Sequence, residues 1–381
     1  MTPTISLCLI VKNEEDYIEQ CLNSVLELVN EIIIIDTGST DKTKELALDF
    51  KKNKFPNLKI LDFPWVQDFS SARNFSTSYA TSEWILILDA DEIIAKEDHN
   101  KIKELILKYN KPNTAMGLML IQRNYANNSK LVGWTQNDEK YVSLEKFSGF
   151  YPTPITRLFK NKQEIVFRSK VHESVDDSIF EKKGKIKLTE IPIHHFQYER
   201  GEEYVKQKQL NYFDICKEMV KTRKQDFKVW FDMGVISANY RNSPTDSEKF
   251  FKQSLELNPH YLLSYLQLAT VLEKQNKLEA AITIYKKALS IEKNNFHLVH
   301  NLAVALTKTN KPILALKFFE HAAKLNPNNP HVYTNVGCIF GQLGKFKDAT
   351  EFFQKSLDLN PNDTRVKNLL EGTKNKINKN N

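Results

Sequence analysis

Residues 84–92 read Trp84-Ile85-Leu86-Ile87-Leu88-Asp89-Ala90-Asp91-Glu92. The five apolar residues at its start predict a strand buried on both faces of a parallel sheet. Three carboxylates follow within four residues, where mutual repulsion and burial both oppose ionisation. A divalent cation at the carboxyl end of the strand would offset that repulsion, because hard cations take oxygen ligands. An acidic turn or a helix N-cap would give the same short pattern, so the neighbouring sequence is needed to choose between them.

Three strand-like runs precede this stretch, at 5–11, 31–35 and 58–63, and apolar residues at helical spacing separate them. The alternation of strands and helices predicts a mostly parallel sheet covered by helices, with its ligand crevice at the carboxyl ends of the strands. The second run ends at Asp36-Thr37-Gly38-Ser39-Thr40-Asp41, which places a carboxylate at that edge. The sequence has no GxGxxG after the first strand and no GxxxxGK[ST], which disfavours a dinucleotide site and a P-loop.

Downstream of the acidic stretch the pattern predicts a helix, a strand, a long polar loop or lid, and four short strands. In chain order they span 101–109, 115–122, 124–151, 155–160, 164–168, 185–190 and 192–196. Aromatic residues of the predicted lid could stack on a sugar or an acceptor, or could be core residues. These aromatics are Trp134, Tyr141, Phe150 and Tyr151.

A 34-residue repeat occupies the C-terminal part of the chain. It is marked by the triplets Leu257-Asn258-Pro259, Ile291-Glu292-Lys293, Leu325-Asn326-Pro327 and Leu359-Asn360-Pro361. Aromatic and small residues recur in register: Phe251, Tyr285, Phe319 and Phe353, with Ala281, Ala315 and Ala349. This is the tetratricopeptide pattern, and four units exceed the three needed to bury a continuous core.

The sequence therefore predicts an α/β domain over residues 1–200, a helical linker over 201–226, and four repeats over 227–361 that form an all-α solenoid. A polar tail over 362–381 is expected to fray.

Bulk composition narrows the class of protein. The 381 residues include 54 basic and 47 acidic ones, for a formal net charge of +7. This modest, dispersed excess does not indicate nucleic-acid binding. The four cysteines have no zinc-type spacing. Without a signal-peptide pattern or an apolar run of ~18 residues, we expect a cytoplasmic protein with no transmembrane segment.

Several blocks of the N-terminal half occur in a characteristic order. The first four are Cys8-Leu9-Ile10-Val11-Lys12-Asn13-Glu14-Glu15, Ile34-Ile35-Asp36-Thr37-Gly38-Ser39-Thr40-Asp41, Asp68-Phe69-Ser70-Ser71-Ala72-Arg73-Asn74 and Asp89-Ala90-Asp91. The later ones are Arg157-Leu158-Phe159, Val171-His172-Glu173 and His194-His195-Phe196-Gln197-Tyr198. Together they resemble the inverting, GT-A-fold glycosyltransferases of family 2.

The resemblance is narrower than the family as a whole. The later blocks are similar to the branch that contains the lipopolysaccharide-core glucosyltransferases and the peptide S-glycosyltransferases of glycosylated bacteriocins. In the latter a tetratricopeptide-like helical domain also follows the GT-A domain. The resemblance implies a Rossmann-like α/β domain that binds a nucleotide sugar.

The resemblance also implies roles for the residues that match the donor-binding motifs. Val11, Asn13 and Asp36 would contact uracil or ribose. The loop that carries Asp68 and Arg73 would close over the nucleoside.

For the metal, the resemblance implies that Asp89 faces the ribose and that Asp91 binds Mg²⁺ or Mn²⁺ bridging the two phosphates. The ion would stabilise the leaving nucleoside diphosphate. His194 is expected to complete the metal shell, with His195 and His172 as rivals. A core or supporting role is the alternative for each histidine.

An inverting transfer also needs a carboxylate that takes the proton of the acceptor. Glu173 follows Asp91 by 82 residues, about where the family places its base. Asp138 and Glu139 in the predicted lid are the alternatives. All three could also be plain surface carboxylates.

The resulting hypothesis is a metal-dependent inverting glycosyltransferase. It would move a hexose or N-acetylhexosamine from a UDP-sugar to a protein or peptide acceptor recruited by the repeats. One alternative keeps the chemistry but uses a saccharide or lipid-linked acceptor of the cell envelope. Another is a non-catalytic repeat scaffold with a degenerate transferase domain, against which the intact Asp89, Asp91, Arg73 and Glu173 argue. The repeats could also join two copies as a homodimer.

Overall fold

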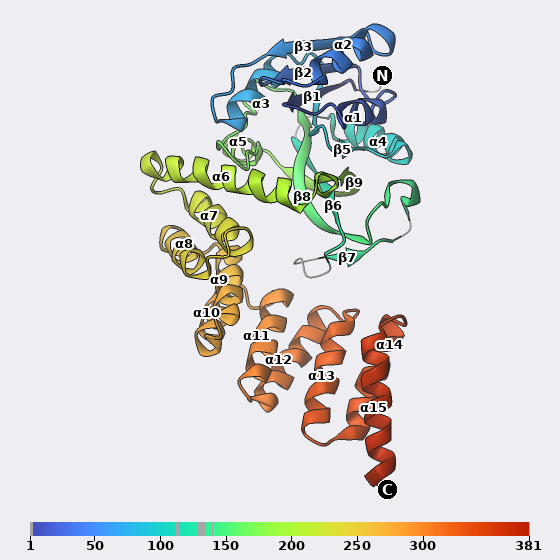
Figure 1. Cartoon of the computed structure of the whole chain (residues 1–381), viewed down its shortest axis with the longest axis vertical. Helices are drawn as coiled ribbons and strands as arrows, with labels where there is room; N and C mark the ends of the chain where they lie inside the picture. The colour runs from blue at the N-terminus through green and yellow to red at the C-terminus, as the bar shows by residue number, and fades with distance from the viewer. Residues whose placement is uncertain (1–2, 112–113, 129–133, 139, 381) are drawn as a thin grey trace. The chain divides into compact units, whose positions relative to one another are not determined.

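The computed structural model describes residues 3–111, 114–128, 134–138 and 140–380 (Figure 1). The chain divides into two compact units, Met1–Ile215 and Cys216–Asn381. Helix α6 (Glu202–Thr222) runs across the boundary between them.

The N-terminal unit is built on one sheet. Strands β1 (Ile5–Val11), β2 (Glu31–Asp36), β3 (Leu58–Asp62) and β4 (Trp84–Ile87) lie in the order β3-β2-β1-β4 and pair in parallel. The predicted alternation of strands and helices is confirmed over this part of the chain. Beyond β4 the order continues through β8, β6, β9 and β5.

The second half of the sheet is mixed. β8 pairs antiparallel with both β4 and β6, whereas β6 and β9 are parallel to each other. β5 pairs antiparallel with β9, and β7 with β8. These strands are β5 (Glu92–Ile93), β6 (Gly117–Ala126), β7 (Thr135–Gln136), β8 (Gly149–Lys160) and β9 (Ile186–His195).

Helices cover both faces of the parallel strands. Leu7 and Leu9 of β1 share a core with α1 (Ile18–Ser24), α2 (Thr43–Asn53) and α4 (His99–Tyr109). Cys8 points to the opposite face, whose core includes residues of α3 (Phe69–Ser78) and α5 (Asp176–Glu181). Burial of both faces explains why these strands are nearly continuous apolar runs. Short 3₁₀ turns lie at Lys96–Asp98, Val142–Leu144 and Gln197–Arg200.

Three sequence-based predictions for residues 115–196 need correction. Both ends of the predicted lid are strands of the sheet, because β6 extends to Ala126 and β8 begins at Gly149. Residues 164–168 form no strand: Ile165 and Phe167 pack into the core, and a single bridge joins Arg168 to Ser174. Residues 185–190 and 192–196 belong mainly to one strand, β9, whose register against β6 shifts midway.

The C-terminal unit consists of helix pairs. They are α7 (Phe227–Asn239) with α8 (Pro244–Leu257), α9 (Leu262–Lys274) with α10 (Leu278–Ile291), α11 (Phe296–Lys308) with α12 (Pro312–Leu325), and α13 (Pro330–Gln342) with α14 (Phe346–Leu359). The recurring aromatics are at most 2% exposed, and the recurring alanines are fully buried. The 34-residue period therefore corresponds to one helical hairpin, whose large and small side chains alternate in the core.

The turn inside each hairpin uses a left-handed residue. Asn242, Asn276, Asn310 and Gly344 have φ between 49° and 73°, and they recur every 34 residues. Asn and Gly are the residues that adopt this conformation at least cost, so they end the first helix of each pair.

The polar tail was predicted to fray, but it is helical. Residues Thr364–Asn380 form helix α15, and Val366 and Leu370 are buried against Phe353 and Leu357. Two apolar residues four positions apart suffice to dock one face of this polar helix on the last repeat.

Candidate active site

A cavity of about 840 Å³ opens at the carboxyl ends of the parallel strands. Residues after β1, the turn after β4, and Arg73 of α3 line it, together with Glu173. One face of α6 closes it. The ligand crevice predicted for this sheet edge is therefore present, and all of its lining residues belong to the N-terminal unit.

Asp36 and Asn13 connect the ends of β1 and β2. Asn13 has φ 57°, and its Oδ1 accepts a hydrogen bond of 2.8 Å from the backbone N–H of Thr40. Asp36 Oδ1 accepts the N–H groups of Gly38 and Ser39, both at 2.7 Å. Asp36 Oδ2 is buried and has no hydrogen-bond partner in the described residues. This oxygen is an unused acceptor, but Asp36 does not itself line the cavity, whereas its neighbours Val11 and Thr37 do.

Asp89 lies between two arginines. Its Oδ1 pairs with Arg73 Nη2, and its Oδ2 lies 2.7 Å from Arg157 Nη2. Arg157 Nη2 is also 3.2 Å from Oε1 of Glu92, whose side chain is fully buried. Burial raises the pKa of Asp89, but Arg157 and Arg73 more than offset this and hold it well below its usual range. Both carboxylate oxygens of Asp89 are therefore committed to positioning cations at the cavity wall.

Asp91 faces His195. His195 Nε2 lies 3.6 Å from Asp91 Oδ1, and both side chains are less than 10% exposed. His195 Nδ1 contacts Asn124 Oδ1 at 2.7 Å, and because an amide oxygen only accepts, this contact makes Nδ1 the donor. Burial raises the pKa of Asp91, but His195 and Lys208 bring it down to about 2. Asp91 is therefore ionised. Burial lowers the pKa of His195, but Asp91 more than offsets this and raises it, which favours a protonated ring with Nε2–H directed towards Asp91. Loss of that proton frees Nε2 to bind a metal ion.

His194, the expected metal ligand, does not line the cavity. Its Nδ1 contacts the Tyr125 hydroxyl at 2.8 Å, and its ring stacks on that of Tyr125. Burial lowers the pKa of His194 to about 4. Successive side chains of a strand point to opposite faces, so the two histidines of β9 cannot both reach Asp91. The geometry favours His195, the rival of His194.

His172, the third candidate, does line the cavity. Its ring lies 5.8 Å from that of Tyr212 of α6. It therefore lies on the cavity wall beside α6.

Asp91 and His195 fit a hard divalent cation whose shell is completed by the substrate. The described parts of the chain contain no group of three or more His, Cys, Asp or Glu side chains placed to hold a metal. Mg²⁺ usually binds through one or two carboxylates and keeps waters and substrate phosphates as its other ligands. An ion held jointly by this pair and a diphosphate is therefore compatible with the site.

Glu173 has one occupied and one open carboxylate oxygen. Its Oε1 accepts a hydrogen bond of 3.1 Å from Arg73 Nε. Its Oε2 accepts none from any residue that the structure describes, and the side chain lines the cavity with 14% exposure. An anchored carboxylate with a free oxygen meets the geometric requirement for a general base.

The rivals of Glu173 are placed differently. Asp138 receives two hydrogen bonds from Arg123, of 2.9 and 2.8 Å, and it does not line the cavity. The hydrogen bond from Arg123 lowers the pKa of Asp138. Glu139 lies outside the described residues.

Asp68 acts as a helix cap. Its Oδ1 accepts the N–H of Ser71 at 3.0 Å and the hydroxyl of Ser70 at 2.7 Å, at the first turn of α3. The cavity is lined instead by Trp65 and Phe69 of the same loop. Their ring centroids lie 4.7 Å apart, edge to face.

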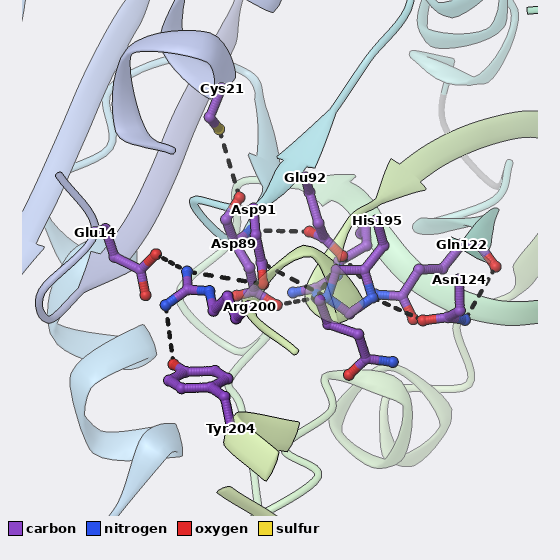
Figure 2. A network of polar contacts seen from close by, with 12 residues as sticks. Glu14, Cys21, Asp89, Asp91, Glu92, Gln122, Asn124, His195, Arg200 and Tyr204 are labelled. Carbon is purple, nitrogen blue, oxygen red and sulfur yellow. Dashed lines mark hydrogen bonds and ion pairs between the residues drawn. The ribbon is translucent and has the colours of Figure 1, made fainter. Parts of the chain in front are cut away.

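Sequence reasoning missed the contribution of residues after His195. Arg200 pairs with Glu14, donates a hydrogen bond of 2.9 Å to the Tyr204 hydroxyl, and lies 3.9 Å from Asp91 (Figure 2). Arg157 also received no role, although its block was noticed. The ion pairs of both arginines join segments far apart in the sequence, so no local pattern indicates them.

The comparisons with known proteins agree with this architecture. Residues 6–166 match the model for glycosyl transferase family 2. Residues 262–295, 296–329 and 330–363 match tetratricopeptide repeat models. The predicted recognition and fold class, a family 2 domain followed by helical repeats, are confirmed. The first helix pair, α7 with α8, precedes the matched repeats.

Three curated relatives are similar over much of the chain. The SPbeta prophage-derived glycosyltransferase SunS of Bacillus subtilis is 27% identical over 76% of this chain and 64% of its own length. A TPR repeat-containing protein of Synechococcus elongatus is 28% identical over 77% and 68%. An uncharacterized glycosyltransferase of Rickettsia felis is 28% identical over 58% and 72%. The chain thus spans about 64% of the length of SunS.

Within the described residues, no helix combines the length and apolar character needed to cross a membrane.

Proposed function

A glycosyl transferase family 2 domain precedes tetratricopeptide repeats in this chain, and from this premise we propose that the protein is a glycosyltransferase. It transfers a hexose or N-acetylhexosamine from a UDP-sugar to a protein or peptide, with inversion at the anomeric carbon. Mg²⁺ or Mn²⁺ assists the reaction.

One observation carries the proposal. A single cavity is lined by Asp91 and by the anchored carboxylate of Glu173, and His195 contacts Asp91 without itself lining the cavity. Asp91 comes from the end of β4, His195 from β9 and Glu173 from the segment before α5. A degenerate scaffold has no need to keep an ionised, buried carboxylate opposite an oriented histidine.

The chain's own residues support each event of the transfer. The acceptor's nucleophilic atom forms a bond to the anomeric carbon while the bond from that carbon to the diphosphate oxygen breaks. The electron pair of the broken bond stays on the diphosphate. Glu173 Oε2 takes the acceptor's proton while Arg73 holds Oε1 in place. Asp36 Oδ2 is available to accept the N3–H of uracil.

Asp91 and His195 would hold the divalent ion, which when bound supplies Lewis-acid stabilisation of the diphosphate. Arg73 and Arg157 already occupy both carboxylate oxygens of Asp89. If Asp89 faces the ribose as expected, it must therefore bind the ribose while keeping these two contacts.

The repeats support a protein or peptide acceptor. Tetratricopeptide arrays expose extended surfaces suited to polypeptide partners. A saccharide or lipid-linked acceptor is the alternative, with the same chemistry at Glu173. No observation on the described residues supports the possible homodimer through the repeats.

A donor screen tests the proposal. The purified chain is heated with Mn²⁺ and a panel of UDP- and GDP-sugars, and slow donor hydrolysis is scored in parallel. A donor at 100 times its Kd should add about 2.7 kcal/mol of stability. Asp91→Asn should abolish the metal-dependent part of the shift, whereas Asp49→Asn on the exposed side of α2 should leave it unchanged.

The outcomes separate the function classes. Stabilisation by one UDP-sugar that needs metal and Asp91 supports the enzyme. If no nucleotide sugar stabilises the protein, the enzyme proposal is wrong and a non-catalytic repeat scaffold is favoured. With a donor in hand, Glu173→Gln should keep donor binding and lose transfer, and equal transfer by this variant would remove Glu173 as the base.

A further inference from the structure

Helix α6 presents one face to the cavity. The lining residues of this helix are Tyr204, Gln207, Lys208, Asn211, Tyr212 and Ile215, spaced three or four apart. They belong to the same compact unit as the sheet. Five of the six carry a polar group, unlike the apolar stripe with which a helix packs on a core. The sequence predicted a linker here, whereas the structure places a polar wall beside Asp91 and Glu173.

Buried side chains fix α6 in this position. Val205 and Phe213 are at most 6% exposed. Tyr212 packs edge-on against Phe69, with ring centroids 5.5 Å apart, and against His172 at 5.8 Å. The lining face of α6 is therefore held against the first turn of α3 and the segment that carries Glu173.

Lys208 is a half-buried cation on this face without an ion-pair partner. No acceptor lies within hydrogen-bond or ion-pair distance of its Nζ among the residues that the structure describes. Tyr212 raises the pKa of Lys208, burial lowers it, and Asp91 and Asp89 raise it further, so that it ends above the usual range. Lys208 is therefore charged, with three N–H donors available for a ligand.

The other cations of the cavity are used differently. Arg73 and Arg157 are paired with Asp89, and Arg200 beside them is paired with Glu14. Lys12 also lines the cavity without a partner in the described chain, but its side chain is exposed. Lys208, in contrast, is half-buried on the part of the cavity wall that α6 forms.

We propose that Lys208 binds the diphosphate of the nucleotide-sugar donor, which makes α6 part of the donor site. This inference rests on the proposed function. The diphosphate would lie between the Asp91–His195 pair and Lys208. When the bond from the sugar breaks, its electron pair stays on the diphosphate oxygen, and the ammonium of Lys208 stabilises that added charge.

A ligand series isolates the contact. Binding of uridine, UMP and UDP is measured by calorimetry with Mn²⁺ and again in EDTA, for the wild type and Lys208→Met. We expect the variant to lose about 10- to 100-fold in affinity for UDP, less for UMP and almost none for uridine. The reason is that only a ligand with phosphate groups can accept the charge-assisted hydrogen bond of Lys208. Lys208→Arg should recover part of the UDP affinity. Lys206→Met, on the exposed side of α6, is the control.

The outcomes distinguish this inference from the proposed function. Wild-type protein that binds none of the three ligands would overturn both. UDP affinity of Lys208→Met within twofold of the wild type would overturn the role of Lys208 alone. Equal losses for uridine and UDP would also overturn it, since they would indicate a distorted site. The contact is supported if, both with Mn²⁺ and in EDTA, the loss of affinity grows with the number of phosphates in the ligand.

Discussion

The two units bury polar groups in different ways. In the N-terminal unit, charged side chains are held by partners far away in the sequence, as in the pair Arg73–Glu173, which is 100 residues apart. In the C-terminal unit the buried hydroxyls of Ser254 and Ser264 meet across ten residues, within neighbouring helices. The charged site forms only when the whole sheet is assembled, whereas each repeat needs only its neighbours. Substitutions in the two units should therefore have different consequences.

The largest effect is expected at Arg157. The variant Arg157→Met removes the cation that Asp89 shares with the fully buried Glu92. Asp89 keeps its pair with Arg73, but the fully buried carboxylate of Glu92 loses its cationic partner, so the free energy of unfolding should fall by about 3–5 kcal/mol. Urea denaturation measures this fall.

The control for Arg157 is Arg168→Met, which breaks an exposed pair with Glu181. Its effect should stay within about 0.5 kcal/mol. Equal effects of the two variants would contradict the view that non-local ion pairs hold the sheet edge together.

The second effect separates the two histidines of β9. His195→Gln should raise the Mn²⁺ concentration for half-maximal donor binding about 10- to 100-fold, because a supporting ligand of the ion is lost. His194→Gln should leave this concentration unchanged while lowering the melting temperature, since it breaks the contact with Tyr125 in the core. The opposite result would restore His194 as the metal ligand.

The third effect tests local packing in the repeats. A Cβ added at Gly337 would lie 2.7 Å from the ring of Phe353, which is 2% exposed. Gly337→Ala should therefore destabilise the protein by about 1–3 kcal/mol through overpacking. In the same helix a Cβ at Gly341 meets nothing within 4 Å, so Gly341→Ala should add about 0.5–1 kcal/mol through helix propensity. Stabilisation by both variants would show that the aromatic ring can move.

The smallest effect is a pH dependence in the repeats. Hydrogen bonds from Lys252 and Lys277 lower the pKa of Glu248 to about 2. A depressed pKa in the folded state adds stability above the ordinary pKa of a glutamate, and this stability is lost as pH falls towards 2. We expect Glu248→Gln to cost about 1 kcal/mol at pH 7, with the difference shrinking from pH 5 to pH 2. A difference that persists at pH 2 would contradict the ion pairs as its cause.

Local patterns predicted a large part of the fold. The 34-residue period predicted the helix pairs, because each unit repeats the same contacts with its neighbours. The apolar runs predicted the four parallel strands, since burial of both faces leaves a clear signal. The strand predicted at 164–168 was wrong, because the alternating residues Ile165 and Phe167 pack into the core while their segment does not pair with a strand of the sheet.

The site was predicted unevenly for a physical reason. Asp36, Asp91 and Glu173 follow strands or lie in recognisable blocks, so their place at one sheet edge could be inferred. The choice between His194 and His195 depends on which face of β9 each side chain points to, and that follows from its register with β6.

The sequence by itself determined an α/β sheet with four parallel strands and carboxylates at its edge, followed by a tetratricopeptide array, because these features depend on local periodicity. Only the tertiary structure decided which charges meet. It placed Arg157 beside Asp89, His195 beside Asp91, and the lining face of α6 against the cavity. Those contacts join segments that the chain itself keeps far apart, and no local pattern encodes the direction of a side chain across a sheet.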